Sequence, residues 1–287
     1  MLSSIQFQQL IQKIKEKKEL QGISSDFVLE SIKKVLQSEP KLLQELSYNF
    51  QAKSFHFKHT VKKVREKLRR DYGLFRGQEK VKERQKIVTI LMRDKLTPSF
   101  IEELLHFHAS TKERKEYYPQ LYQQLFTITG KPARILDLGC GLNPLSLPLM
   151  KIKRVHYHAL DISEEEISLL NTFFAVLKKQ NPTFSGKAEV MDITKTAQLS
   201  LLPEHDLCFL LKMTDILDKG RGHKMTENVL KAILATYVVI SFPTITMGGK
   251  KMNFPRRRWI ELLCYRLKYT FDLLEFEKEI FYVIKKN

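Results

Sequence analysis

The chain has 287 residues, of which 43% are hydrophobic, and 49 Lys and Arg against 32 Asp and Glu give a net charge of +17. This length suits two modest domains or one large one, and the apolar content is ample for a core. No stretch approaches the ~18 apolar residues of a membrane span, and the N-terminus lacks the apolar run of a signal peptide. We therefore expect a cytoplasmic protein without a membrane partner.

The excess of positive charge indicates a polyanionic partner, because Lys and Arg neutralise phosphates and release counterions. Nucleic acid is the first candidate and an anionic membrane surface the second. Cys140, Cys208 and Cys264 lie far apart, which predicts a reducing compartment with neither disulfides nor a zinc cluster. Two His-x-His pairs, at 106/108 and 156/158, have no evident third ligand, so we expect no metal site.

Residues 1–105 predict a helical, basic domain. Apolar residues recur at helix spacing over 5–14 and 27–36, and the few glycines fall between the periodic pieces. A third helical stretch, 61–70, carries cations all round its surface. One charged run is usually a solvated face. Two further basic runs, 250–251 and 256–258, favour contact with phosphates, for which we select Lys62, Lys63, Arg69, Arg70, Lys250 and Lys251.

From about residue 130 onward, short apolar runs alternate with helical stretches, which predicts β-α units on a parallel sheet. The predicted strands are 133–139, 155–161, 187–191, 207–212 and 237–242, and the helices between them are 144–151, 164–180 and 223–235.

The tail of the chain breaks this alternation. A helix over 257–268 is followed by two strand-like runs, 271–280 and 281–286, with no helix between them. The last strand should therefore pair antiparallel. The whole predicts a Rossmann-like α/β domain over 106–287, preceded by the helical domain over 1–105.

A glycine turn follows the first predicted strand. Asp137 ends the apolar run, Gly139 and Gly141 follow, and Asn143 with Pro144 suits an N-cap and the first helical position. Glycines allow a sharp turn and close approach to a ligand, here a nucleotide-like cofactor. NAD is excluded, since its G-x-G-x-x-G fingerprint needs a third glycine where Pro144 stands.

Acidic residues end three successive predicted strands: Asp137, Asp161 and Asp192. Asp161 lies about 20 residues beyond the turn, where a carboxylate commonly binds ribose hydroxyls. Asp192 should then lie near an adenine amino group. A single Asp at a strand end is more often a helix cap, so the prediction of a cofactor site rests on all three.

The Asp-x-Gly-x-Gly turn resembles motif I of the methyltransferases that use S-adenosylmethionine. The methionine end of that cofactor needs a cation for its carboxylate. Just upstream, Ser110 or Thr111 can cap a helix that carries Arg114, whose planar guanidinium matches a carboxylate. Seen alone, this segment would read as a capped surface helix with solvated charges.

Together the segments resemble the aminoglycoside-resistance 16S rRNA (guanine-N7)-methyltransferases. That family implies a helical rRNA-binding domain before a methyltransferase domain, and a guanine in the decoding A-site of the assembled 30S subunit as target. Ile245 departs from the basic residue common in the family. The matching pieces are 108–114, 137–145, 211–212, 241–244, 248–250 and 282–287.

By position, the resemblance implies that Arg114 binds the methionine carboxylate and that Asp161 binds the ribose. It implies a positioning role for Lys212 beside the reacting centre or the RNA. The residues it implies at the cofactor are His108, Ser110, Thr111, Arg114, Gly139, Asp161, Ile162, Asp192, Ile193 and Lys212.

Guanine N7 carries a lone pair and no proton, so no general base is expected. A flipped base needs an aromatic partner, for which Tyr72, Phe75 and Phe107 are candidates, although each fits a core position as well. The methylated guanine would repel a polycationic drug. Two alternatives stay open: a methyltransferase of this fold that acts on another RNA base or another substrate, and a non-catalytic rRNA-binding factor. We assume a monomer.

Overall fold

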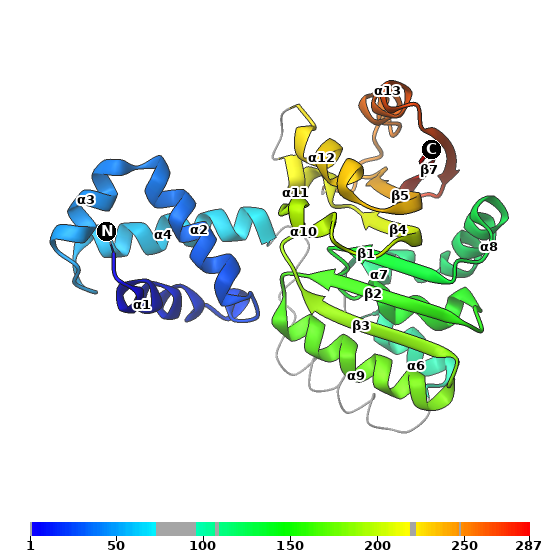
Figure 1. Cartoon of the computed structure of the whole chain (residues 1–287), viewed down its shortest axis with the longest axis horizontal. Coiled ribbons are helices and arrows are strands. Elements are labelled where there is room, and N and C mark those ends of the chain that lie inside the picture. The colour runs from blue at the N-terminus through cyan, green and yellow to red at the C-terminus, as the bar shows by residue number, and fades with distance from the viewer. Residues whose placement is uncertain (1, 73–95, 107–108, 219–221, 247) are drawn as a thin grey trace. The chain divides into compact units, whose positions relative to one another are not determined.

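The computed structural model describes residues 2–72, 96–106, 109–218, 222–246 and 248–287 (Figure 1). The chain divides into two compact units. The helical unit comprises residues 1–78 with 162–165, and the sheet unit comprises 79–161 with 166–287. No helix among the described residues combines the length and apolarity needed to cross a bilayer.

Serines begin several helices of the helical unit. Ser3 and Gln6 form a capping box at the first helix, and Ser24 and Ser54 accept backbone N–H bonds at the starts of the second and fourth. Pro40 occupies the first turn of the third helix. The helices are α1 (Ser4–Lys15), η1 (Lys18–Leu20), α2 (Ser25–Ser38), α3 (Pro40–Tyr48) and α4 (Phe55–Tyr72).

Helix α4 organises the core of this unit, packing against α1, α2 and α3. Its buried residues Phe57, Val61, Val64 and Leu68 recur at intervals of three and four, so they share one stripe of the helix. The Lys and Arg residues between them therefore stand on the remaining surface, which leaves one helix to serve both the core and the charged face.

The sheet unit is built on seven strands in the order β3-β2-β1-β4-β5-β7-β6 (Figure 1). The first five strands are parallel, and β7 pairs antiparallel with both β5 and β6. The predicted Rossmann-like fold with an antiparallel last strand is confirmed. The strands are β1 (Arg134–Leu138), β2 (Val155–Asp161), β3 (Phe184–Val190), β4 (His205–Leu211), β5 (Ala235–Pro243), β6 (Thr270–Glu275) and β7 (Glu279–Lys285).

Helices cover both faces of the sheet, because alternate strand residues point to opposite sides. Ile135 and Phe209 pack in one core with residues of α6, α8 and α9, whereas Leu136 and Cys208 pack in the other with α12 and α13. The helices are α6 (Pro98–Leu105), α7 (Ala109–Arg114), α8 (Tyr118–Thr129), η3 (Asn143–Met150), α9 (Glu164–Gln180), α10 (Thr196–Leu199), α11 (Thr214–Asp218), α12 (Lys224–Ala232) and α13 (Arg258–Leu267).

Several boundaries differ from those expected. Helix α6 buries Ile101 and Leu104 in the core of the sheet unit, so the division of the chain lies before residue 105. The helix after the glycine turn is a 3-10 helix containing Pro148, which has no N–H to donate. The turn between the last two strands falls at 276–278, because β6 ends at Glu275.

Candidate functional site

The glycine turn, residues 139–142, joins the end of β1 to η3. Gly139 and Gly141 have φ angles of +62° and +49°, the left-handed region that favours glycine. The backbone N–H of Cys140 donates to the Leu160 carbonyl at 3.0 Å, and that of Gly141 donates to Asp161 Oδ2 at 2.9 Å. The turn that contains Gly139 therefore lies against the end of β2, where Asp161 binds Gly141.

Asp137 holds this turn from inside the strand. The residue is 1% exposed, and its carboxylate accepts hydrogen bonds from Asn143 Nδ2 at 2.9 Å and the Tyr157 hydroxyl at 2.7 Å. Burial raises the pKa of Asp137 to about 6, although both hydrogen bonds act in the opposite direction. The predicted Asn143 N-cap is wrong: Leu142 is the N-cap, and the Asn143 side chain binds Asp137 and Tyr118.

Asp192 lies just beyond β3, next to Met191, whose N–H donates to the Asp161 carbonyl at 2.9 Å. Its Oδ1 accepts bonds from the N–H and the hydroxyl of Thr194 at 3.0 and 2.7 Å. The neighbouring Ile193 is 5% exposed and packs in a core cluster of the sheet. Ile162 packs against the apolar core of the helical unit. The positions of Ile162 and Ile193 are thus explained by the apolar cores that they contact.

Arg114, the last residue of α7, forms a buried ion pair. Its Nη2 donates to Glu279 Oε1 at 2.7 Å and its Nε to Oε2 at 2.9 Å, with side chains 2% and 0% exposed. Burial alone would raise the pKa of Glu279, but the charges of Arg114 and Lys212 hold it below its usual value. Two donors expected to meet a cofactor carboxylate are therefore bonded within the chain.

Lys212 extends this pair into a four-charge network with Glu113, Arg114 and Glu279. Its ammonium bonds to Glu113 and lies 3.5 Å from Glu279 Oε2, while its N–H donates to Ser241 Oγ at 3.0 Å. Lys212 is 8% exposed and adopts φ 55°, an uncommon angle for a residue with a side chain. Strain of this kind persists where the surroundings determine the conformation, often at functional sites.

The upstream segment is only partly described. Ser110 and Thr111 lie inside α7, which begins at Ala109, so neither is its N-cap. The Thr111 hydroxyl is buried and donates to the Leu105 carbonyl at 2.8 Å. His108, Phe75, Phe107 and the side chain of Tyr72 lie outside the residues that the structure describes.

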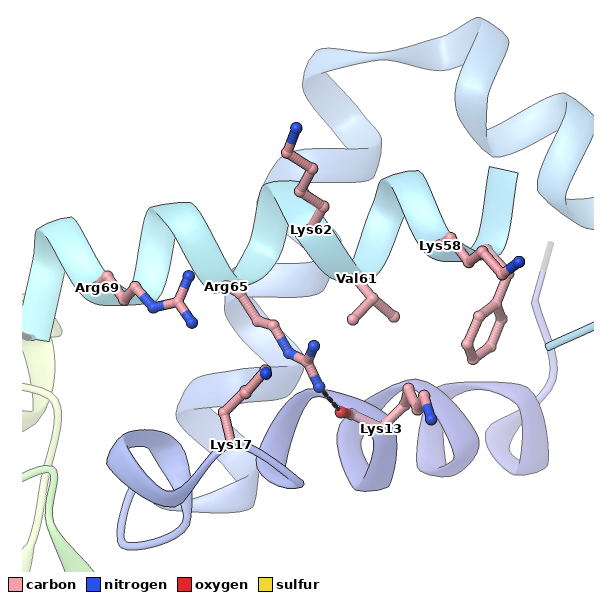
Figure 2. A pocket seen from close by; sticks show the side chains of 8 residues that line it. Lys13, Lys17, Lys58, Val61, Lys62, Arg65 and Arg69 are labelled. Carbon is pink, nitrogen blue, oxygen red and sulfur yellow. Dashed lines mark hydrogen bonds between the residues drawn. The ribbon is translucent and has the colours of Figure 1, made fainter. Parts of the chain in front are cut away.

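A basic groove lies on the helical unit between α1 and α4 (Figure 2). Its volume is about 350 Å³, and Phe57 and Val61 line it together with six cations. Arg65 bonds to the carbonyls of Ile14 and Lys13, so it satisfies the carboxyl end of α1. The residues that line the basic groove are Lys13, Lys17, Phe57, Lys58, Val61, Lys62, Arg65 and Arg69.

The four cations predicted on α4 divide between two surfaces. Lys62 and Arg69 line the basic groove, whereas Lys63 and Arg70 line a second hollow that also contains Glu39 and Glu66. Arg69 pairs with Glu19 at 2.7 Å, and Lys63 pairs with Glu39 at 2.5 Å.

Three lysines of the groove differ from these paired cations. Within the described ranges, Lys17, Lys58 and Lys62 have no carboxylate at salt-bridge distance. The groove therefore presents positive charge that the described carboxylates do not pair with.

The remaining predicted cations, Lys250 and Lys251, are exposed in the loop after β5. In the described part of the chain, no three His, Cys, Asp or Glu side chains gather as metal ligands. Of the histidine pairs, His158 bonds to Glu189 and His156 to Ser185.

The model of the ribosomal RNA methyltransferase (FmrO) family matches residues 59–283. The chain belongs to this family. The match covers more than half of its length, including β1 to β6, the glycine turn and the four-charge network. The family expected from the motifs is thereby confirmed, and with it the enzyme class.

Individual relatives agree with this assignment. A 16S rRNA (guanine(1405)-N(7))-methyltransferase of Frankia casuarinae is 28% identical over 190 residues, 65% of this chain and 64% of that protein. One of Serratia marcescens is 30% identical over 199 residues, 67% of this chain and 72% of that protein. The match thus spans slightly less than two thirds of the Frankia protein. The crystal structure of the 16S rRNA methyltransferase RmtF, in complex with S-adenosyl-L-homocysteine, aligns over 100% of both chains with TM-score 0.73 and 19% identity, a likeness of fold.

Proposed function

We propose that this protein transfers a methyl group from S-adenosylmethionine to N7 of a guanine in the decoding A-site of 16S rRNA. It acts on the assembled 30S subunit, as a cytoplasmic monomer, and makes the ribosome resistant to aminoglycosides. The glycine turn held against Asp161, in a chain of the ribosomal RNA methyltransferase family, carries the proposal. The relatives from Frankia and Serratia are named as enzymes of this specificity.

The glycine turn fits the cofactor. S-adenosylmethionine, when bound, supplies a methyl group activated by the positive charge on sulfur. Gly139 has no side chain, so a ligand can approach its backbone closely. A Cβ at this residue would lie 2.5 Å from the Met213 side chain. The Asp161 carboxylate, fixed by the Gly141 N–H, suits ribose hydroxyls. Asp192 follows Met191, whose backbone N–H donates to the Asp161 carbonyl. These three residues would hold the nucleoside part.

Arg114 would hold the methionine end in a manner that the sequence did not predict. Glu279 binds its Nε and Nη2, which fixes the plane of the guanidinium. A cofactor carboxylate would therefore meet the other edge of the same planar group. Thr111, buried in the turn of helix before Arg114, keeps α7 against the Leu105 carbonyl.

The reaction asks for orientation and no proton transfer, because guanine N7 has a free lone pair. Lys212 is the residue we assign to positioning. Ser241 fixes its backbone and the carboxylates of Glu113 and Glu279 balance its charge. A balanced lysine can donate hydrogen bonds beside a purine that becomes cationic without repelling it as a free ammonium would.

The basic groove supports an RNA substrate. Lys17, Lys58 and Lys62, which pair with no carboxylate among the described residues, line it together with the apolar side chains of Phe57 and Val61. Phosphate contacts by such residues position a protein on nucleic acid without reading sequence. Lys250 and Lys251 supply further charge on the sheet unit.

The test is to incubate the protein with 30S subunits and S-adenosylmethionine labelled on the methyl group. Cleavage with borohydride and aniline then maps any N7-methylguanine. We expect a single modified guanine in the decoding A-site, and none with Lys212→Ala. Label at another base would contradict the proposed target and leave a related RNA methyltransferase. No label, together with no binding of the cofactor in calorimetry, would leave only an rRNA-binding factor.

A further inference from the structure

The loop between β5 and α13, residues 244–257, leaves the sheet at the carboxyl ends of the parallel strands, where ligands bind in folds of this kind. Its first part is a hairpin. Thr246 N–H donates to the Lys250 carbonyl and Met252 N–H to the Thr244 carbonyl, both at 2.8 Å. Gly249, at φ +79°, turns the chain. The loop is therefore folded on itself by its own backbone.

Arg257 fixes the second part of this loop. Its Nη1 donates to the carbonyls of Phe254 and Pro255 at 3.1 and 2.7 Å, and its Nη2 to the carbonyl of Pro243 at 3.1 Å. Pro243 is the last residue of β5, so one guanidinium ties the loop to the strand from which it departs.

The same residue is held in turn by the sheet. Its guanidinium lies 5.3 Å from the centre of the Phe242 ring, and its backbone N–H donates to the Tyr282 hydroxyl at 2.7 Å. All these acceptors are neutral, so the charge of Arg257 is not cancelled by them. The sequence placed residues 256–258 together as cations for phosphate, but Arg257 is an internal clamp and Arg256 pairs with Glu261 at 2.9 Å.

Phe254 is the side chain that this clamp presents. It is 86% exposed, although the carbonyl of its own residue is bound by Arg257. Single exposed apolar residues are ordinary on protein surfaces, and Leu201 is 84% exposed as well. Phe254 differs because its backbone is fixed and because the exposed Lys250 and Lys251 belong to the same loop.

We propose that Phe254 stacks on a nucleobase of the ribosomal RNA, that Lys250 and Lys251 bind the adjoining phosphates, and that Arg257 is the positioning residue that holds Phe254 in place. This inference rests on the proposed function and adds to it the element that receives an unpaired base. An aromatic ring between cations is the arrangement by which proteins bind single-stranded or unstacked RNA, because every base has a face to stack.

Substitutions at residue 254 separate stacking from apolar bulk. We expect Phe254→Ala and Phe254→Leu to bind 30S subunits about ten-fold more weakly, since a leucine offers no aromatic face, and Phe254→Trp to bind as the unmodified protein does. The control is Leu201→Ala, which removes an equally exposed apolar side chain elsewhere on the sheet unit. Calorimetry with S-adenosylmethionine should give the same affinity for all four variants.

Arg257→Lys tests the clamp, because a lysine keeps the charge but cannot donate to three carbonyls at once. We expect it to weaken 30S binding as Phe254→Ala does, with no further loss in the double variant. Additive losses, or full binding by Phe254→Ala or Phe254→Leu, would overturn the proposal. Binding is measured without cofactor, so a protein that bound through Phe254 but methylated nothing would refute only the proposed function.

Discussion

The glycine turn and the basic groove show two ways to build a binding surface. Around the turn, the polar groups of Asp137, Asn143 and Tyr157 are buried, and Asp137 is bonded to the other two, so each position depends on its neighbours. In the groove, Lys17, Lys58 and Lys62 are exposed, and no carboxylate fixes them among the described residues. The turn suits a small ligand of one shape, whereas the groove suits a repetitive, charged polymer.

This difference predicts how each surface responds to mutation. Removing one member of a buried network leaves its partners unsatisfied, so the cost is large and local. Removing one exposed lysine leaves one phosphate without its cation, so the cost is small and shared across the groove.

The largest effect is expected from Glu279→Gln, which leaves Arg114 and Lys212 buried without their shared counter-charge. Breaking a buried ion pair costs about 3–5 kcal/mol. Urea unfolding should show that loss. The control is Glu227→Gln, whose partners Lys231 and Arg266 are exposed and whose pairs contribute roughly 0–1 kcal/mol. Equal losses in the two variants would show that the network is not a buried unit.

Acid should act on the sheet unit through two buried groups of opposite effect. Burial first, and then the charge of His158, lowers the pKa of His205 to about 4 from 6.5. The unfolded chain therefore binds that proton first, and stability falls as the pH drops from 6.5 towards 4. The pKa of Asp137 is raised from 3.8 to about 6, so the folded chain binds its proton first and stability rises from pH 6 towards 4.

These two contributions are about 3 kcal/mol each and act in opposite directions. Between pH 7 and pH 4, His205→Gln should gain stability relative to the unmodified protein, and Asp137→Asn should lose it. Urea unfolding at both pH values measures the change. If the stability of both variants changed with pH as that of the unmodified protein does, the opposite effects assigned to His205 and Asp137 would be contradicted.

Gly139→Ala should separate backbone strain from cofactor binding. An alanine at this left-handed φ costs about 1–2 kcal/mol, and the flexible side chain of Met213 must move aside. Gly130→Ala is the matched control, with φ +70° and no atom within 4 Å of the new Cβ. Both variants should lose stability, while only Gly139→Ala should lose affinity for S-adenosylmethionine in calorimetry. Loss of affinity in both would place the effect outside the turn.

The smallest effect is expected in the groove. Lys58→Ala with Lys62→Ala should flatten the salt dependence of 30S binding, by roughly 0.7–0.9 in logarithmic slope for each phosphate that is no longer neutralised. Lys63→Ala is the control, because Lys63 is paired with Glu39 on the other side of α4. A slope that changed equally for Lys63→Ala would show that net charge, and not the groove, determines binding.

Local patterns were enough to predict the sheet, since apolar runs mark β1, β4, β5 and β7, although β3 has no such run. They were also enough to place Gly139 and Asp161 at the ends of neighbouring strands. Glu279 could not be found in this way, because it is 165 residues from Arg114 and only the tertiary fold brings β7 to the end of α7. The clamp by Arg257 was missed for the opposite reason, since three adjacent arginines look equivalent until their acceptors are known.

The pairing of Arg114 with Glu279 also has a consequence during synthesis of the chain. Strand β7 enters the sheet between β5 and β6, which are both made before it. A nascent chain that has emerged only as far as β6 holds Arg114 and Lys212 without their common carboxylate and has a gap in its sheet. Because domains fold as units during translation, the last strand completes the core and the site in one event. A chain without β7 thus lacks both a strand of its sheet and the carboxylate shared by Arg114 and Lys212.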